Sequence, residues 1–452
     1  MPDLMPASHR TDSAPPLQRR NFYLNVANGA LSYAGGRAAD LGTVVPLLVL
    51  RLVGAEWAVG LAQAVQDTAR VAMQLFASRL LDARPHKRPP YILWSVVRVG
   101  ALCTASGALL TGVGREPWIV LSVLLGCLFL LMVGNGVAEL AWSDITARSV
   151  PSRRRGSLMT GRRVIGLVLS LIVAAPLVDY LLSPRSPYAF PANYGMLFVI
   201  NTVLSIAAWT VFSLTREPNP DAARHRLSLR QHFTRGVRIL QRDDNYRSLL
   251  RLKFLLGLTA ALPTFFVAFG KVALGLPDRS AAMFLSLRMV SEICGSLVLG
   301  RVSDGHGNRR VIVISTWLGV LTFGLATASA LLAYLPAAGT PPPAACATLL
   351  SATFLALGLL QAARDMGEFN YMLDIAPGLK RTSYLSFANA FLLPLSLLPI
   401  GVGILVPFSG YLPLFGAATL ISGVAIVASR RLDEPRDSKQ PGEQAPQAGE
   451  AG

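Results

Sequence analysis

The sequence has little charge for its length. Only 15% of its 452 residues are Asp, Glu, Lys or Arg, whereas 52% are apolar. Charged residues approach a quarter of an ordinary soluble domain, so this composition excludes a soluble globular protein. A lipid bilayer suits such a chain, and a helix needs about 20 apolar residues to cross its hydrocarbon core. We count twelve stretches of this kind along the sequence.

Other features are scarce as well. The four cysteines lie in separate apolar stretches without paired or metal-type spacing, and none of the five histidines lies within a stretch. There is no Gly-x-x-x-x-Gly-Lys-Ser/Thr loop and no nucleophile elbow. We therefore expect no enzyme activity, no cofactor and no metal site. The first residues lack an apolar centre, so we expect no cleavable signal peptide.

Acidic residues are rarer than basic ones. The sequence has 25 Asp and Glu but 42 Lys and Arg, which gives a net charge of +17. In a soluble protein this excess would suggest nucleic acid, but here the basic residues fall in alternate loops between apolar stretches. Basic loops mark the cytoplasmic side of a membrane protein. The pattern therefore predicts cytoplasmic termini, an even number of spans and no nucleic-acid partner.

The chain divides into two sets of six stretches. We expect a disordered cytoplasmic N-terminus at 1–20, a six-helix bundle at 21–214, a cytoplasmic linker at 215–246, a second six-helix bundle at 247–429 and a disordered cytoplasmic tail at 430–452. In the linker, apolar residues recur at helical spacing among arginines, which predicts an amphipathic helix. This helix would lie on the anionic inner leaflet or pack under the bundles.

Two kinds of residue are expected to interrupt the spans. The first span, from about Phe22 to Leu52, contains Gly29, Gly35 and Gly36, which we expect to break it. Prolines remove a helix hydrogen bond and are candidate bending points elsewhere. They are Pro176, Pro263, Pro394 and Pro399.

A charged turn occurs twice, about half a chain length apart, which indicates an internal repeat. The better copy runs from Gly300 to Arg310 and the weaker one from Ser78 to Arg88. In each copy an aspartate, Asp304 or Asp82, stands four residues after the start, and basic residues close the turn.

A second repeated motif has nearly the same period. Its first copy contains Glu139, Asp144, Pro151 and Arg155, and its second contains Glu368, Asp374, Pro377 and Arg381. The arginine follows the proline by four residues in both copies. Two independent motifs with one period support a six-plus-six architecture.

These motifs resemble those of the major facilitator superfamily of secondary transporters. In that family the loop between spans two and three carries Gly-x-x-x-Asp-x-x-Gly-x-Arg-Arg. The better copy matches this pattern at Gly300, Asp304, Gly307, Arg309 and Arg310. The weaker copy has Ser78 and Pro85 at the two glycine positions. The second motif is similar to that of a bacterial subgroup of the family.

The resemblance implies an all-α integral membrane protein with twelve transmembrane helices in two six-helix bundles. It also implies that the charged turns latch the bundles on the cytoplasmic side. The candidate gating residues are Asp82, Arg88, Gly300, Asp304, Gly307, Arg309 and Arg310. The alternative is that the arginines only set topology.

Charged residues inside the apolar stretches are candidates for a solute or coupling-ion pathway. A charge at mid-membrane costs about 2.5 to 3.5 kcal/mol on insertion scales and usually faces the bundle interior. These residues are Arg37, Asp40, Asp67, Arg70, Arg288, Glu292, Arg364, Asp365 and Glu368. Their spacing lets Asp67 pair with Arg70, and Arg288 with Glu292, along single helices. They line a pathway in one interpretation and form structural ion pairs in the other.

The sequence favours a secondary transporter that moves a small solute by alternating access, with a proton as a candidate coupling ion. The other hypothesis is a membrane sensor or scaffold that keeps this fold without transport. We expect a monomer in the inner membrane of a bacterium, with a small solute and the lipid bilayer as partners.

Overall fold

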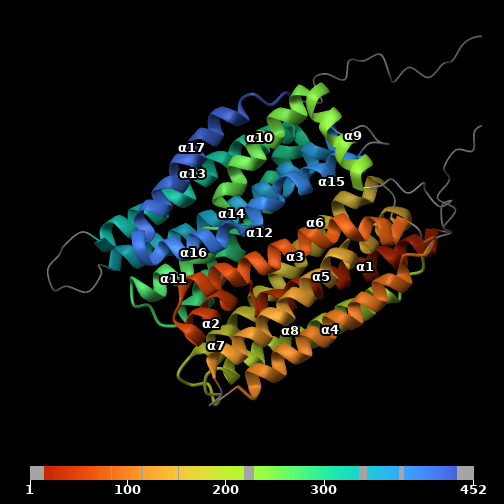
Figure 1. Ribbon diagram of the computed structural model, residues 1–452. Coiled ribbons are helices and arrows are strands. Elements are labelled where there is room, and N and C mark those ends of the chain that lie inside the picture. The colour runs from red at the N-terminus through yellow and green to blue at the C-terminus, as the bar shows by residue number, and fades with distance from the viewer. Residues whose placement is uncertain are drawn as a thin grey trace, which may run out of the picture.

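The two halves of the chain form two groups of helices that lie side by side. The computed structural model describes residues 15–82, 84–112, 116–150, 152–217, 229–334, 344–375 and 381–434, which are helical apart from short connections. Helices α1 to α8 fill the lower part of Figure 1 and α10 to α17 the upper part, with α9 at one end.

The first group begins with three helices before the first charged turn. The bounds of its elements are α1 (Pro15–Ala38), α2 (Val44–Val53), α3 (Glu56–Asp82), α4 (Arg88–Leu110), α5 (Pro117–Ser149), α6 (Ser152–Leu169), the π-helical η1 (Ser170–Ala174), α7 (Ala175–Leu182) and α8 (Ala192–Ser213).

The second group follows α9 (Leu229–Arg242). Its elements are α10 (Asp244–Thr259), α11 (Thr264–Val272), α12 (Ser280–His306), α13 (Asn308–Tyr334), α14 (Ala344–Ile375), α15 (Arg381–Leu392), the 3-10 helix η3 (Leu393–Leu397), α16 (Leu398–Ser409) and α17 (Tyr411–Ser429).

Ten helical segments of the described chain are long and apolar enough to cross a membrane. The two other expected spans coincide with α1–α2 and with α3. Polar residues explain why these segments are not apolar enough to be counted: α3 carries Gln63, Gln66, Asp67 and Arg70 within its length. Side chains of this kind are tolerated at membrane depth where they face the protein interior.

The first span is interrupted at Asp40 and not at its glycines. Helix α1 ends at Ala38, and the Asp40 carboxylate accepts hydrogen bonds from Gly42 N at 2.9 Å and Thr43 Oγ1 at 3.1 Å. The predicted break at Gly29, Gly35 and Gly36 was wrong, because all three lie inside α1. A carboxylate can satisfy donors freed by a helix break, whereas a glycine inside a helix lets a neighbour approach.

Prolines mark the other irregular segments, as predicted. Pro263 stands between α10 and α11, Pro394 lies in η3, and Pro399 lies in the first turn of α16. Pro176 follows the π-helical η1. Proline lacks the amide donor that a continuous α-helix needs at each position. These prolines therefore explain why the helices break or change type nearby.

The beginning of the chain is more helical than expected. Residues 15–20, predicted as part of a disordered terminus, form the first turns of α1. The cause is the Pro15 and Pro16 pair, since proline favours the first positions of a helix. Arg20 of α1 then donates to the Leu214 carbonyl at 3.2 Å. Residues 1–14 and 435–452 lie outside the described ranges.

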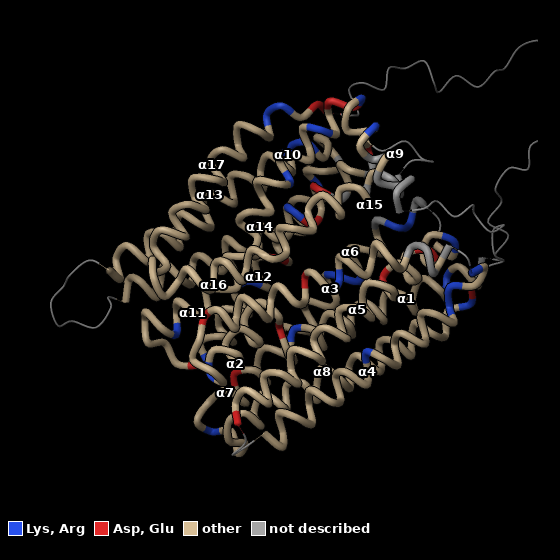
Figure 2. Tube along the Cα trace, in the orientation of Figure 1, with Lys and Arg blue, Asp and Glu red and all other residues tan. Residues whose placement is uncertain are grey.

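Basic residues gather at one end of the molecule. Figure 2 shows blue segments gathered at the end of the molecule where α9 and the start of α1 lie, as the alternate-loop pattern predicted. Helix α9 packs its Val237, Ile239 and Leu240 against the core of the second group. Packing under the helices is therefore the alternative that the contacts of α9 favour.

Candidate functional site

A cavity of about 1620 Å³ lies between the two groups of helices. Leu41 and Gln63 line its inner part, while Arg155 and Ser303 line the part that reaches the basic end of the molecule. Most of its wall comes from the first half, and α12 and α14 supply the rest. Ligand sites usually measure about 300 to 1,000 Å³, so the space would hold a small solute together with water.

The opposite end of the interface is closed by backbone packing. A Cβ added at Gly60 of α3 would lie 2.0 Å from the Pro399 carbonyl oxygen, and one added at Gly403 of α16 would lie 2.6 Å from the Glu56 carbonyl oxygen. Glycine is required for such a close approach. Helices α3 and α16 therefore touch along their backbones.

An ion pair adds to this closure. Arg51 of α2 contacts Asp278, which precedes α12, and Lys271 Nζ lies 2.6 Å from the same carboxylate. Because Arg51 and Asp278 belong to different halves, any opening at this end must separate them.

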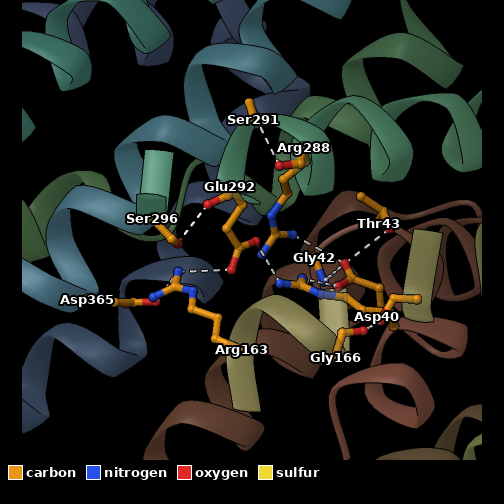
Figure 3. Close-up of polar contacts among 12 residues, drawn as sticks. Asp40, Gly42, Thr43, Arg163, Gly166, Arg288, Ser291, Glu292, Ser296 and Asp365 are labelled. Carbon is orange, nitrogen blue, oxygen red and sulfur yellow. Dashed lines mark hydrogen bonds and ion pairs between the residues drawn. The ribbon is translucent and has the colours of Figure 1, made fainter. Parts of the chain in front are cut away.

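Between the cavity and the closed end, charged side chains cross from one half to the other. Glu292 of α12 accepts from Arg37 Nη2 at 2.8 Å and from Arg163 Nη2 at 2.9 Å. Arg288 Nη1 lies 3.4 Å from Asp40 Oδ1. Figure 3 shows Glu292 and Arg288 of α12 reaching toward Arg163 and Asp40 of the first half. We call this group, with Asp365, the interhalf network.

The network is internally neutral. Its carboxylates are Asp40, Glu292 and Asp365, and its arginines are Arg37, Arg163 and Arg288. The Glu292 side chain is only 2% exposed. Removing such a charge from water is costly, and close opposite charges offset that cost only while the contact lasts. The network therefore ties the halves together in this arrangement.

The partners of Arg288 and Glu292 differ from those that the spacing predicted. Arg288 and Glu292 lie on one helix but contact Asp40, Arg37 and Arg163 of the other half. Asp67 accepts a hydrogen bond from Gln63 at 2.8 Å. Helical spacing predicts neighbours within a helix, but it contains no information on a carboxylate from another helix.

The remaining candidates divide between the cavity and the second half. Asp67 and Arg70 line the cavity. Glu368 forms an ion pair with Lys253 of α10 at 2.7 Å, and Arg364 donates to Thr259 Oγ1 at 3.2 Å. The structure therefore brings Arg37, Asp40, Arg288, Glu292 and Asp365 together but not Arg364 or Glu368.

The charged turns are stabilised within their own halves. Gly307 has φ of 85°, a conformation that favours glycine. Arg309 N donates to Glu434 Oε2 at 3.2 Å, and Arg88 N donates to Glu217 Oε2 at 3.1 Å. Gly300 lines the cavity. The side chains of Asp82, Asp304 and Arg381 and the whole of Pro151 and Pro377 lie outside the described residues.

Glu217 and Glu434 form a repeated feature that the sequence interpretation missed. Each follows the last helix of its half, and each precedes a proline in the sequence. Each carboxylate accepts from the first amides of the helix after a charged turn. The repeated Glu-Pro pair was the available signal.

Residues of the second repeated motif stabilise helix ends. Arg155 Nε donates to the Val150 carbonyl at 3.2 Å, and Asp144 pairs with Arg148. In the other copy Asp374 accepts from Asn308 Nδ2 at 2.6 Å. Glu139 accepts from Gln74 Nε2 at 2.8 Å and also lines the cavity.

Three further arginines were not anticipated. Arg162 and Arg163 stand at the start of the fifth apolar stretch, directly after a basic loop, and both lie in α6 and line the cavity. Arg98 lies inside the third apolar stretch, and that position was a usable signal. Within the described ranges no group of three or more His, Cys, Asp or Glu residues could hold a metal ion.

Comparison with known proteins finds structural matches but no sequence match. No protein-family model matches the sequence, and no curated protein does so either. A bacterial homologue of the iron transporter ferroportin in the inward-facing state superimposes with a TM-score of 0.67, at 14% identity, over 93% of this chain and 99% of that one.

Two other solved structures agree. A nucleoside transporter matches with a TM-score of 0.64 at 16% identity, over 91% of this chain and 99% of that one. A D-xylose-proton symporter matches with a TM-score of 0.65 at 12% identity, over 93% of this chain and 98% of that one. The chain therefore shares the fold of these solved transporters, which is the fold that the resemblance of its motifs implied.

Proposed function

We propose that this chain is a secondary transporter that moves a small solute across the membrane by alternating access. The observation that carries the proposal is a cavity between two halves, with backbone contacts and ion pairs closing the interface beyond it. Alternating access needs this arrangement, because the halves rock around a site between them. The shared fold supports the same conclusion.

We further propose twelve spans in two six-helix bundles, 21–214 and 247–429, with both termini in the cytoplasm and a linker at 215–246. The gathering of basic residues at the cavity end supports this orientation. The cavity then faces the cytoplasm. The membrane that we propose is the inner membrane of a bacterium, with the protein acting as a monomer.

In this proposal the interhalf network acts during the conformational change. Rotation of the halves moves Glu292 relative to Arg37 and Arg163, and a bound solute or a proton can compensate for a lost contact. Glu292, Asp40 and Asp365 are the network carboxylates available to a coupling proton. The charged turns with Asp82 and Asp304 would latch the cavity end once it closes.

Solute flux in proteoliposomes tests the proposal. The purified chain is reconstituted and assayed across a panel of sugars, nucleosides, organic acids and amines, with and without a pH gradient. We expect concentrative or exchange flux of at least one solute, and loss of that flux in Arg37→Gln. Arg185→Gln, at an exposed position outside the cavity, serves as the control. No flux of any solute by well-folded protein would favour the sensor or scaffold hypothesis.

A further inference from the structure

Among the cavity-wall arginines that form no ion pair with a described carboxylate, two are held in place by neutral side chains and aromatic rings. Arg98 of α4 and Arg162 of α6 both line the cavity, yet neither forms an ion pair in that part of the chain. The arginines of the interhalf network, in contrast, all contact carboxylates. Arg98 is only 5% exposed. A charge buried in this way is costly, which calls for a compensating anion.

Neutral groups hold both guanidinium groups in place. Arg98 donates to Asn135 Oδ1 at 3.1 Å and to Ser95 Oγ at 2.6 Å, and its Nε has no hydrogen-bond partner in the described structure. Its guanidinium carbon lies 3.9 Å from the centre of the Trp209 ring. Amides, hydroxyls and ring faces orient a cation without neutralising it.

Arg162 is held in the same manner. Its Nη1 donates to the Asn25 carbonyl at 2.7 Å and to Asn28 Oδ1 at 3.0 Å. Its guanidinium carbon lies 4.4 Å from the centre of the Trp142 ring. Its Nη2 forms no hydrogen bond with another described residue, so that edge of the guanidinium group is available to a ligand in the cavity.

A glycine makes room for each arginine. A Cβ added at Gly134 would lie 2.6 Å from Arg98 Cγ, and one added at Gly29 would lie 2.5 Å from Arg162 Cβ. Both side chains therefore occupy places that an alanine at the facing position would obstruct. Gly29 thus makes room for a cavity arginine instead of breaking the first span.

The described wall of the cavity carries more positive than negative side chains. Its described arginines are Arg70, Arg98, Arg155, Arg162 and Arg163, and its described carboxylates are Asp67, Glu139 and Asp365. Asp365 is already paired with Arg163, and Glu139 and Asp67 accept hydrogen bonds from glutamines. The cavity is therefore an electropositive space with fixed guanidinium donors.

We infer that Arg98 and Arg162 form an anion subsite for a carboxylate or phosphate group of the solute. This inference rests on the transport proposal and names the class of solute. Guanidinium groups match both anions through paired donors. The apolar lining of Met132, Ala138 and Ile165 leaves space for an uncharged remainder of the molecule.

Ligand binding by the purified full chain tests this inference. The probes are benzoate and succinate as carboxylates, inorganic phosphate and glycerol 3-phosphate as phosphates, xylose and uridine as neutral solutes, and choline as a cation. Each is scored by the shift it causes in the unfolding temperature of the same variant, and the titration gives an apparent Kd. Comparing the carboxylate probes with the phosphate probes shows which anionic group the subsite prefers.

We expect either the carboxylates or the phosphates to raise the unfolding temperature of the protein. Arg98→Gln and Arg162→Gln should each weaken the apparent Kd about tenfold or more, because a hydrogen bond between charged groups is lost. Arg98→Lys should retain part of the binding, since it keeps the charge. Gly134→Ala should weaken binding by displacing Arg98, whereas Arg185→Gln should bind like the parent.

Failure of the subsite and failure of transport give different results. The subsite is refuted if no anion binds, or if anions bind equally well to the folded Arg98→Gln and Arg162→Gln variants. Flux of neutral or cationic solutes alone would refute the subsite and leave transport intact. Anion binding that both glutamine variants lose, without flux of any solute in proteoliposomes, would support the subsite and refute transport.

Discussion

Glu292 of α12 accepts a hydrogen bond from Arg37 of α1 at 2.8 Å, across the boundary between the two halves of the chain. The contact joins residues that are 255 positions apart. It lies where the cavity ends and the closed part of the interface begins. Any motion of one half against the other must stretch or exchange this hydrogen bond, which makes it the first place to test the mechanism.

Glu292→Gln should lower the stability of the protein and its transport rate. Removing one partner of a buried ion pair costs about 3 to 5 kcal/mol, but Arg37 and Arg163 each keep a second carboxylate, so we expect about 2 kcal/mol. Thermal unfolding in detergent measures the loss. Asp179→Asn, at an exposed position, is the matched control.

A double-mutant cycle separates this contact from its surroundings. Arg37→Gln and Glu292→Gln combined should show a coupling energy of about 1 kcal/mol or more, as contacting residues do. Strict additivity of the two changes would show that the contact does not contribute to stability.

Gly60→Ala should open the closed end of the interface. The new methyl group would lie 2.0 Å from the Pro399 carbonyl oxygen, so α3 and α16 must separate. We expect a several-fold rise in labelling of a cysteine placed at Gln63 by a reagent added from the side opposite the cavity opening. The four native cysteines are replaced beforehand.

Gly100→Ala is the control for this change, because a Cβ at Gly100 meets no atom within 4 Å. Equal labelling of the Gly60→Ala and Gly100→Ala variants would contradict the close contact between α3 and α16.

Gly307→Ala should destabilise the turn between α12 and α13. The residue has φ of 85° and ψ of 163°, a backbone region that is essentially restricted to glycine, so an alanine there costs about 1 to 3 kcal/mol. The added Cβ would also approach the Glu434 carboxylate. Gly305→Ala, two residues earlier within α12, meets open space and should be neutral or stabilising. Equal unfolding temperatures for the two variants would argue against this conformation.

Glu217→Ala should loosen the start of α4. The Glu217 carboxylate accepts from the partly buried Lys87 N at 2.8 Å and from the exposed Arg88 N at 3.1 Å, and leaving a buried amide unpaired costs about 1 to 3 kcal/mol. Hydrogen exchange at residues 84–91 should accelerate. Glu116→Ala provides the comparison, because Glu116 precedes α5 without capping it through its side chain. Unchanged exchange at 84–91 would rule out this capping role.

Much of the fold was predictable from the sequence because its signals are local. Apolar stretches of spanning length, basic residues in alternate loops and the repeat of the Gly300 to Arg310 turn each need only neighbouring residues to be recognised. The prolines at irregular helix positions, such as Pro263 and Pro394, belong to the same kind of information. The break in the first span could not be predicted from such local signals, because it depends on the hydrogen bonds that the Asp40 carboxylate accepts.

The candidate site was predictable only as a set of residues. Sequence alone marked Arg37, Asp40 and Glu292, since charges are rare in apolar stretches. Only the tertiary structure decided that Glu292 pairs with Arg37 and Arg163, and that Arg98 has no carboxylate partner among the described residues. The reason is physical: helical spacing fixes neighbours on one helix, whereas an ion pair between halves depends on how separate helices pack.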